Sequence, residues 1–380
     1  MSANTVTENK TVKDSKNQKI LKFANSKPEA AGKSFLSQQK HLPAWFNLAA
    51  LAVALVIALL FNVLMKPEAD WVSAGIWTGL IFLVIAVIFG YSVEGRRYGA
   101  DRVASSLIIG TFILAVIPLI SLLYTVLLQG WARMSAGGYL TATTAGTSIA
   151  GSVTGVGHAI LGTFIITGVT ALISVPLGIL TAVYLVEYGK GPFAKTITFL
   201  VDIMTGIPSI VAGLFAAAMF PLILQVLTGS PEFKTGFSGS VALVVLMTPI
   251  VVRNTEEHLR LVPNGLRESS YALGVTKART INKVVLRTSA SGIISGVVIA
   301  IARVIGESAP LMITAGTTDI YNMNMFDGQM LTMPVYVYYQ YKQGNMENAW
   351  GGALLLILIV LLLNLAARWI AKKFAPAGEA

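Results

Sequence analysis

The feature that most constrains this chain is a series of eight apolar stretches, most of them near or above the ~20 residues that a helix needs to cross a bilayer. Of the 380 residues, 54% are hydrophobic and only 12% are charged, whereas a soluble domain carries about 25% charged residues. Because lipid offers no partners to backbone polar groups, this pattern predicts an all-helical transmembrane bundle. The expected spans lie near residues 45–65, 72–92, 104–129, 157–186, 197–227, 238–252, 292–313 and 350–371, the sixth being the shortest.

Basic residues follow one side of the expected membrane. With the N-terminus inside, 23 of the 28 Lys and Arg residues lie on the cytoplasmic side. Lys66, Arg133, Lys234 and Lys342 would lie outside, and Arg303 would lie within a span. Since cytoplasmic loops are rich in Lys and Arg, we expect both termini in the cytoplasm. The basic residues behind the net charge of +10 are explained by this sidedness, and membrane lipid is their expected partner. The charge therefore does not indicate a nucleic-acid partner.

Composition divides the chain into an N-terminal tail, a transmembrane part and a short C-terminal tail. The first segment is rich in Lys, Ser and Asn, and we expect it to be a disordered cytoplasmic tail. Ala31-Gly32-Lys33-Ser34 in this tail lacks the earlier glycine and the preceding strand of a phosphate loop, so it predicts no nucleotide site. The expected parts are the tail 1–43, an accessory transmembrane hairpin 44–103, a transmembrane core 104–373 and a tail 374–380.

A long polar segment, residues 253–291, separates two apolar spans and carries seven basic residues. Most ordered connections are far shorter, so a segment of this length suggests a use. Gly274 suits a left-handed helix stop, and Thr276 can cap a following helix. The segment therefore predicts a short helix, a glycine corner and a second short helix, together a cytoplasmic docking handle. Four apolar residues are spaced to share one helix face: Leu259, Val262, Leu266 and Leu273.

Part of this segment resembles the coupling loop of the membrane subunits of ABC importers. The family pattern is Glu-Ala-Ala, three residues, Gly, nine residues, Ile, any residue, Leu-Pro, and it is matched here by Glu268, Gly274, Val284 and Leu286. Two serines stand in place of the two alanines, and Arg287 stands in place of the proline. The resemblance implies that a partner ATPase docks on this segment, with these residues coupling it: Glu268, Ser269, Ser270, Gly274, Leu266 and Leu273.

Three further motifs resemble the permease subunits of phosphate importers: residues 204–213 (MTGIPSIVAG), 251–257 (VVRNTEE) and 303–311 (RVIGESAPL). Of the two homologous permeases in such systems, the Thr-Glu-Glu stretch resembles the A subunit. The resemblance covers roughly residues 105–371 and implies the type I importer fold in the plasma membrane of a prokaryote. It also implies a second permease, an extracytoplasmic phosphate-binding protein and an ATPase dimer that binds ATP and Mg²⁺. We expect this chain to be neither an enzyme nor the holder of a cofactor or metal.

Two charged residues fall inside the seventh span, Arg303 and Glu307, four residues apart and so on one expected helix face. Arg at a bilayer centre costs about 2.5–3.5 kcal/mol, so we expect both to face protein or an aqueous path. The neighbouring Gly306 and Pro310 allow a break that lets backbone line a cavity. Either the two form a structural ion pair or pair with other helices, or Arg303 contacts the transported anion while Glu307 positions Arg303, tunes the charge of the site or acts as a gate. A guanidinium suits phosphate because it binds two oxygens at once.

Other functions are open at this point. The chain could be an ABC permease for another oxyanion, such as sulfate or molybdate. An ion-coupled secondary transporter is a weaker alternative, because we find no convincing internal repeat. A membrane enzyme is weaker still, since no His, Asp or Glu cluster has catalytic or metal-ligand spacing and the chain has no cysteine. Asp202 is expected to cap the fifth span, with a salt bridge to a cytoplasmic Arg as the alternative.

Overall fold

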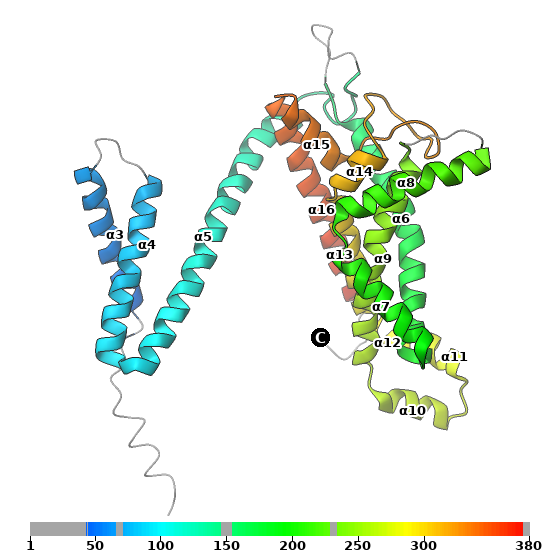
Figure 1. The fold of residues 1–380 in the computed structure, drawn as a ribbon, viewed down its shortest axis with the longest axis horizontal. Helices are drawn as coiled ribbons and strands as arrows, with labels where there is room; N and C mark the ends of the chain where they lie inside the picture. The colour runs from blue at the N-terminus through cyan, green and yellow to red at the C-terminus, as the bar shows by residue number, and fades with distance from the viewer. Residues whose placement is uncertain (1–42, 44, 66–70, 146–153, 229–233, 375–380) are drawn as a thin grey trace, which may run out of the picture. The chain divides into compact units, whose positions relative to one another are not determined.

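The computed structural model describes residue 43 and residues 45–65, 71–145, 154–228 and 234–374, and every regular element in these ranges is a helix (Figure 1). This confirms the expected all-helical class. The tails 1–42 and 375–380 lie outside the described residues. The longer helices are α3 (Phe46–Met65), α4 (Trp71–Phe89), α5 (Gly95–Met134), α6 (Gly157–Val183), α7 (Pro192–Gly206), α8 (Ser209–Thr228), α9 (Gly236–Leu261), α10 (Asn264–Ala272), α13 (Ala290–Ile305), α15 (Met333–Lys342) and α16 (Met346–Phe374). The shorter ones are the π-helical η1 (Gly90–Glu94), η2 (Tyr184–Tyr188) and η3 (Ile281–Val285), with α11 (Lys277–Thr280), α12 (Leu286–Thr288) and α14 (Ala309–Thr314).

The chain forms two compact units, residues 1–120 and 121–380. Their boundary falls inside α5, which is one unbroken helix from Gly95 to Met134. The expected junction between residues 103 and 104 is therefore not marked by any break in the backbone. The functional division of the chain at that point stays a prediction.

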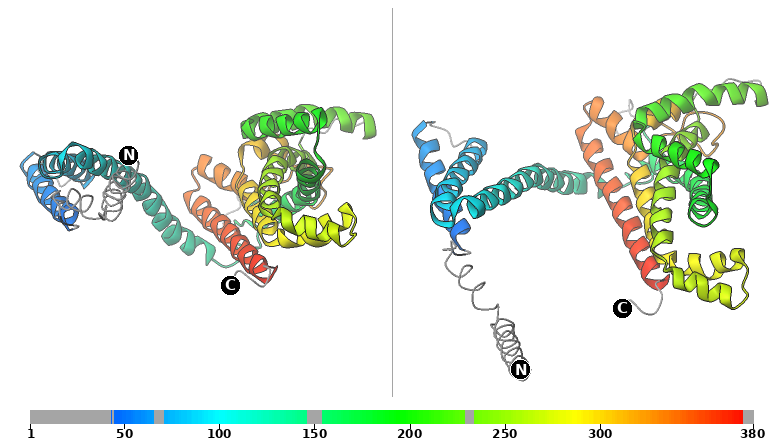
Figure 2. Two further views of the ribbon diagram at one scale, coloured as in Figure 1. Left: turned by 90° about the horizontal axis from the view of Figure 1, so that it is seen from below. Right: turned by 60° about the horizontal axis from the view of Figure 1, so that its bottom comes forward.

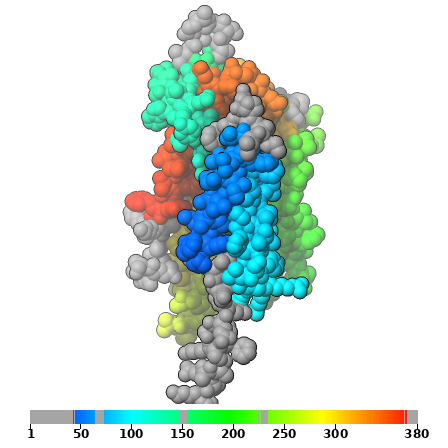
Figure 3. Space-filling view, turned by 90° about the vertical axis from the view of Figure 1, so that its left-hand side faces the viewer, coloured from blue at the N-terminus to red at the C-terminus, as the bar shows by residue number. Residues whose placement is uncertain are grey.

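In the first unit, α3 and α4 lie side by side (Figure 3). Small side chains at every fourth position of α3 let the two backbones approach closely, as is usual between helices in lipid. The chain turns back at Gly95, whose φ is 78°, and Arg102 of α5 then donates to both carboxylate oxygens of Glu94 at 2.6 and 2.8 Å. The buried alanines of α3 are Ala50, Ala54 and Ala58.

The second unit is built around α6 and α9, which pack against each other along their lengths. Their buried faces exchange hydrogen bonds: Ser240 Oγ donates to the carbonyl oxygen of Ile166 at 3.2 Å, and Thr248 Oγ1 donates to Ser174 Oγ at 3.3 Å. In lipid, such contacts and close packing hold helices together, because the hydrophobic effect gives little drive. α13, α15 and α16 complete the bundle.

Within the described ranges, five helical stretches are long and apolar enough to cross a membrane, and two bent pairs would raise the number to seven. One of the five, Ser73–Met134, contains the turn at Gly95, so counting α4 and α5 separately agrees with the eight expected spans. The fifth expected span, 197–227, is wrong as a single straight helix, because α7 and α8 meet at 110°. The seventh span is also interrupted, between α13 and α14.

Both interruptions have a local cause. Ile207 precedes Pro208 and takes an extended conformation (φ −70°, ψ 127°), since the residue before a proline avoids the helical region. In the second case α13 ends at Ile305 with Gly306 as its cap, and α14 begins with Pro310 in its first turn, where no backbone N–H is needed.

The connections that carry Arg133 and Lys342, the residues expected outside, meet at one end of the second unit. Thr144 Oγ1 donates to Asp319 Oδ1 at 2.6 Å, and Tyr321 donates to the carbonyl oxygen of Thr141 at 2.6 Å. The helices α10 and α11 lie at the opposite end of the same unit (Figures 1 and 2). The second unit therefore has two distinct ends, as the expected topology requires.

Candidate functional site

A pocket of about 260 Å³ lies where the two broken helices meet α9. Its wall includes both breaks, with Ile207 and Pro208 on one side and Val304 and Glu307 on the other. Broken backbone at membrane depth is tolerated where it lines a cavity, and both breaks line this pocket. The remaining lining residues are Met204, Thr205, Ser209, Leu246, Pro249, Ile250 and Arg303.

Arg303 and Glu307 both line this pocket, but they do not share a helix face. Arg303 lies in the last turn of α13, whereas Glu307 lies beyond the helix end at Ile305. The expectation of a shared helix face is wrong, because Gly306 ends the helix between the two residues.

The Arg303 side chain is exposed in this chain and, among the described residues, makes no ion pair or hydrogen bond. The hydroxyl-bearing residues Thr205 and Ser209 lie on the same pocket wall. A guanidinium and hydroxyl donors are groups that hold an oxyanion. The pocket volume is several times the ~30 Å³ of a liquid water molecule, so a small oxyanion with some hydration would fit.

Two of the motifs singled out in the sequence touch each other beside the pocket. Gly213 ends the first motif in α8, and Pro310 belongs to the last motif in α14. A Cβ on Gly213 would lie 2.7 Å from Pro310 Cα, closer than real Cβ contacts, so only glycine permits this approach. The contact fixes the two broken helices against one another.

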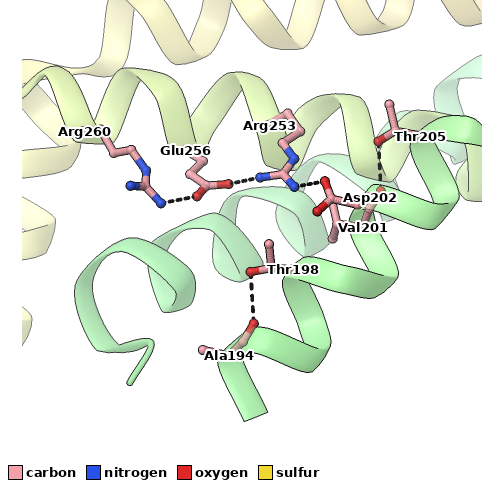
Figure 4. Close-up of polar contacts among 8 residues, drawn as sticks. All are labelled: Ala194, Thr198, Val201, Asp202, Thr205, Arg253, Glu256 and Arg260. Carbon is pink, nitrogen blue, oxygen red and sulfur yellow. Dashed lines mark hydrogen bonds and ion pairs between the residues drawn. The ribbon is translucent and has the colours of Figure 1, made fainter. Parts of the chain in front are cut away.

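A row of alternating charges connects α7 and α9 (Figure 4). Arg253 pairs with Asp202 of α7 and with Glu256 at 2.9 Å, and Glu256 also accepts from Arg260 at 2.5 Å. Glu256 is nearly buried, with 7% of its side chain exposed. Asp202 lies well inside α7 and therefore does not cap it; the alternative of a salt bridge to an Arg is the one found.

The handle predicted from residues 253–291 is present, with different limits. α9 continues through Leu261, α10 forms the first short helix, and the second arm runs through α11, η3 and α12. Gly274 has a φ of 76°, as a left-handed corner requires, and no other atom lies within 4 Å of a Cβ built there. Thr276 is the N-cap of α11, although its side chain makes no capping hydrogen bond.

The apolar residues of this segment do not share one face. Leu259 and Val262 are buried in the core at the end of α9, whereas 43% of Leu266 and 83% of Leu273 are exposed on the handle. The expectation of one continuous face is wrong because Pro263 separates α9 from α10. Leu266 and Leu273 remain available to a partner.

Of the other predicted coupling residues, Glu268 and Ser269 are exposed on α10. Ser270 is buried, and its hydroxyl lies 2.8 Å from that of Thr280 in the second arm. A small side chain at position 270 therefore serves the packing of the two arms. Direct contact of the exposed residues with an ATPase stays a prediction.

Sequence reasoning missed one polar contact of the handle. Arg267 of α10 forms an ion pair of 2.8 Å with Glu187 of η2, and both side chains are largely buried. The two residues lie 80 positions apart, so spacing gives no hint of the contact. The one available signal is an acidic residue directly after a span, on the side where basic residues prevail. In the described part of the chain, no three His, Asp or Glu side chains are grouped to hold a metal ion.

Comparison with known proteins defines the class. Residues 174–377, more than half of the chain, match the family described as "Binding-protein-dependent transport system inner membrane component". The chain is 42% identical over 280 residues to phosphate transport system permease protein PstA 1 of Mycobacterium tuberculosis, covering 72% of this chain and 90% of that protein. It is 35% identical over 287 residues to PstA of Yersinia pestis, covering 74% and 92%. The chain belongs to this family of membrane permeases and, within it, to the PstA permeases.

A solved structure agrees with this fold. The crystal structure of a bacterial alginate ABC transporter, in complex with an alginate pentasaccharide-bound periplasmic protein, matches with a TM-score of 0.54. The match covers 73% of this chain and 97% of that chain at 15% identity, which shows the fold alone. The family match and the long apolar helices of the described ranges show that the protein is a multi-pass membrane permease.

Proposed function

We propose that this chain forms one half of the translocation path of an ATP-driven phosphate importer. The similarity to PstA permeases over nearly their whole length carries the proposal. The pocket supports it, because the guanidinium of Arg303, which makes no ion pair or hydrogen bond to the described residues, lies beside the two helix breaks. The handle supports it as well, because a secondary transporter has no use for such a docking element.

The position of Arg303 also supports a second permease subunit. Its side chain is exposed in the single chain, and neighbouring Ile299 of α13 is 55% exposed. Facing Arg303 toward lipid would cost about 2.5–3.5 kcal/mol. A homologous subunit over this face of α13 would convert the open pocket into a closed aqueous path.

The remaining partners follow from the same proposal. An ATPase dimer binds ATP and Mg²⁺ and docks on the exposed handle residues, and an extracytoplasmic binding protein delivers phosphate. Movement of the handle on ATP binding switches the path between inward-open and outward-open states, as alternating access requires.

Co-purification followed by mass spectrometry tests the assembly. An ATPase and a second permease should be recovered with this chain, and the complex in vesicles should take up phosphate only with ATP. Uptake by this chain reconstituted alone would contradict the proposal and favour an ion-coupled transporter. Sulfate or molybdate uptake that exceeds phosphate uptake would favour the other oxyanion importers.

The proposed orientation places both termini and the handle in the cytoplasm. Reporter fusions after Lys66, Arg133, Lys234 and Lys342 should then all give an external signal. A cytoplasmic signal at Lys234 would show that α9 does not cross the membrane as proposed.

A further inference from the structure

Glu187 holds a central place at the end of α6. It lies in η2, the π-helical continuation of α6, and only 6% of its side chain is exposed. One carboxylate oxygen accepts two hydrogen bonds from Arg267, from Nε at 3.0 Å and from Nη2 at 2.8 Å. The first arm of the handle is thus attached directly to the end of a transmembrane helix.

The same guanidinium also binds the end of α9. Arg267 Nη2 donates to the carbonyl oxygen of Leu259 at 2.9 Å, and Nη1 donates to that of Val262 at 2.6 Å. These carbonyls belong to the last turn of α9, where a helix leaves acceptors without partners. All three nitrogens of Arg267 are therefore engaged, and one side chain joins α6, α9 and α10.

The second arm of the handle returns to the same place. Lys277 of α11 donates to the backbone carbonyl of Glu187, and its ammonium lies 4.5 Å from the ring centre of Tyr188. The left-handed corner at Gly274 reverses the chain between the two arms, which brings both to η2. Both arms are thus attached to two consecutive residues, Glu187 and Tyr188.

The attachment continues toward the pocket. α6 and α9 pack together along their lengths, and α9 supplies Leu246, Pro249 and Ile250 to the pocket wall. A displacement of the handle that is carried by Glu187 and Arg267 would therefore reach α9, which lines the pocket, and α6, which packs against α9.

We propose that Glu187 is a positioning residue that transmits the movement of the handle to α6 and α9, with Arg267 and Lys277 as its two attachments. The inference rests on the proposed function, because it needs an ATPase docked on the handle. Glu187 touches neither the anion nor the ATPase. Its loss should separate ATP hydrolysis from transport while both activities remain measurable.

The test uses the assembled complex in vesicles and measures phosphate transported per ATP hydrolysed. Glu187→Gln keeps the size of the side chain and removes its charge. We expect the variant complex to assemble and hydrolyse ATP, with this ratio lowered about fivefold, the factor by which about 1 kcal/mol changes a rate. Lys277→Gln, a change at an exposed residue, should lower the ratio in the same direction by less. Lys190→Gln is the matched control, since it removes an exposed charge three residues from Glu187 and should leave the ratio unchanged.

A distance measurement distinguishes transmission from simple stabilisation of the fold. The chain has no cysteine, so spin labels at Lys190→Cys and at Ala272→Cys, an exposed residue of α10, have no background from this chain. The distance distribution between them should be narrow in the native complex and broad after Glu187→Gln. An unchanged ratio and distribution in Glu187→Gln would overturn the inference, as would proportional loss of both activities in Lys277→Gln. A native complex without ATP-dependent phosphate uptake would instead contradict the proposed function.

Discussion

Arg303 in the pocket and Arg267 in the handle differ in burial and in hydrogen-bond partners. Arg267 is 87% buried at its side chain, pairs with Glu187 and donates to backbone carbonyls of α9. Arg303 is exposed beside the pocket, and no partner for its side chain occurs among the described residues. An arginine whose donors are all occupied joins parts of a fold, whereas one whose donors face a pocket is available to an anion. We propose that this difference separates a residue that transmits movement from one that meets the transported ion.

Arg253 is intermediate between these two. Arg253 forms ion pairs with Asp202, whose side chain is 58% exposed, and with Glu256, which is nearly buried (Figure 4). Exposed ion pairs contribute little to stability, typically about 0–1 kcal/mol. The pair between Arg253 and Asp202 can therefore open at small cost when α7 and α9 move.

The comparison is tested most strongly by changing the chemistry of Arg303. Lysine keeps the charge but loses the planar fork, so Arg303→Lys should transport poorly while the complex assembles and hydrolyses ATP. Loss of one hydrogen bond to a charged group costs about 1.5–3 kcal/mol, or roughly 10- to 150-fold in uptake. Phosphate uptake and ATPase activity in vesicles measure the effect.

A double variant examines the ion-pair alternative. If Arg303 served only to neutralise Glu307, Arg303→Ala with Glu307→Ala would do less harm than Arg303→Ala alone, because an uncompensated buried charge is costly. We expect no such rescue, since the two side chains form no ion pair in the described part of the chain. Rescue in the double variant, or robust uptake by Arg303→Lys, would favour a structural ion pair over contact with the anion.

Arg303 substitutions are expected to have the larger effect on transport, whereas Arg267 substitutions should have the larger effect on stability. Arg267→Ala leaves the Glu187 carboxylate buried without its partner, which should lower the free energy of unfolding by roughly 3–5 kcal/mol. Arg303→Ala removes no ion pair or hydrogen bond to the described residues and should change it by about 0.5 kcal/mol or less. Thermal denaturation of the purified complex gives both values. Equal effects would contradict the contrast between the sites.

The corner of the handle gives a smaller effect. Gly274→Val forces a side chain into the left-handed region at a cost of about 1–2 kcal/mol, which should displace α11 and with it Lys277. We expect insertion into the membrane to be normal and the ATPase to be uncoupled or detached. Normal ATP-driven uptake by this variant would show that the corner does not determine docking.

The smallest effect on transport is expected from removing residues 1–92. The pocket and the handle both belong to residues 121–380, so a well-expressed truncation should assemble and take up phosphate at a near-native rate. Uptake per assembled complex is the relevant measurement, since protein abundance can change independently. An assembled but inactive truncation would show that the first unit is not accessory.

Hydrophobic length and local turn chemistry were enough to predict the long apolar helices, the broken seventh span and the glycine corner, but not the helix α15. The break in the expected span 197–227 was missed, although Ile207-Pro208 carries the signal, because an apolar run masks a bend. The apolar face assumed across Pro263 failed for a similar reason. The pairs Arg267 with Glu187 and Arg253 with Asp202 join residues 80 and 51 positions apart, and such contacts depend on the packing of whole helices.

The close approach of Gly213 to Pro310 has a mechanical consequence. Each broken helix alone could bend at its break independently of the other. Since the backbones of α8 and α14 are in contact at Gly213 and Pro310, the two broken helices form one stiff unit, and the walls of the path are expected to shift together.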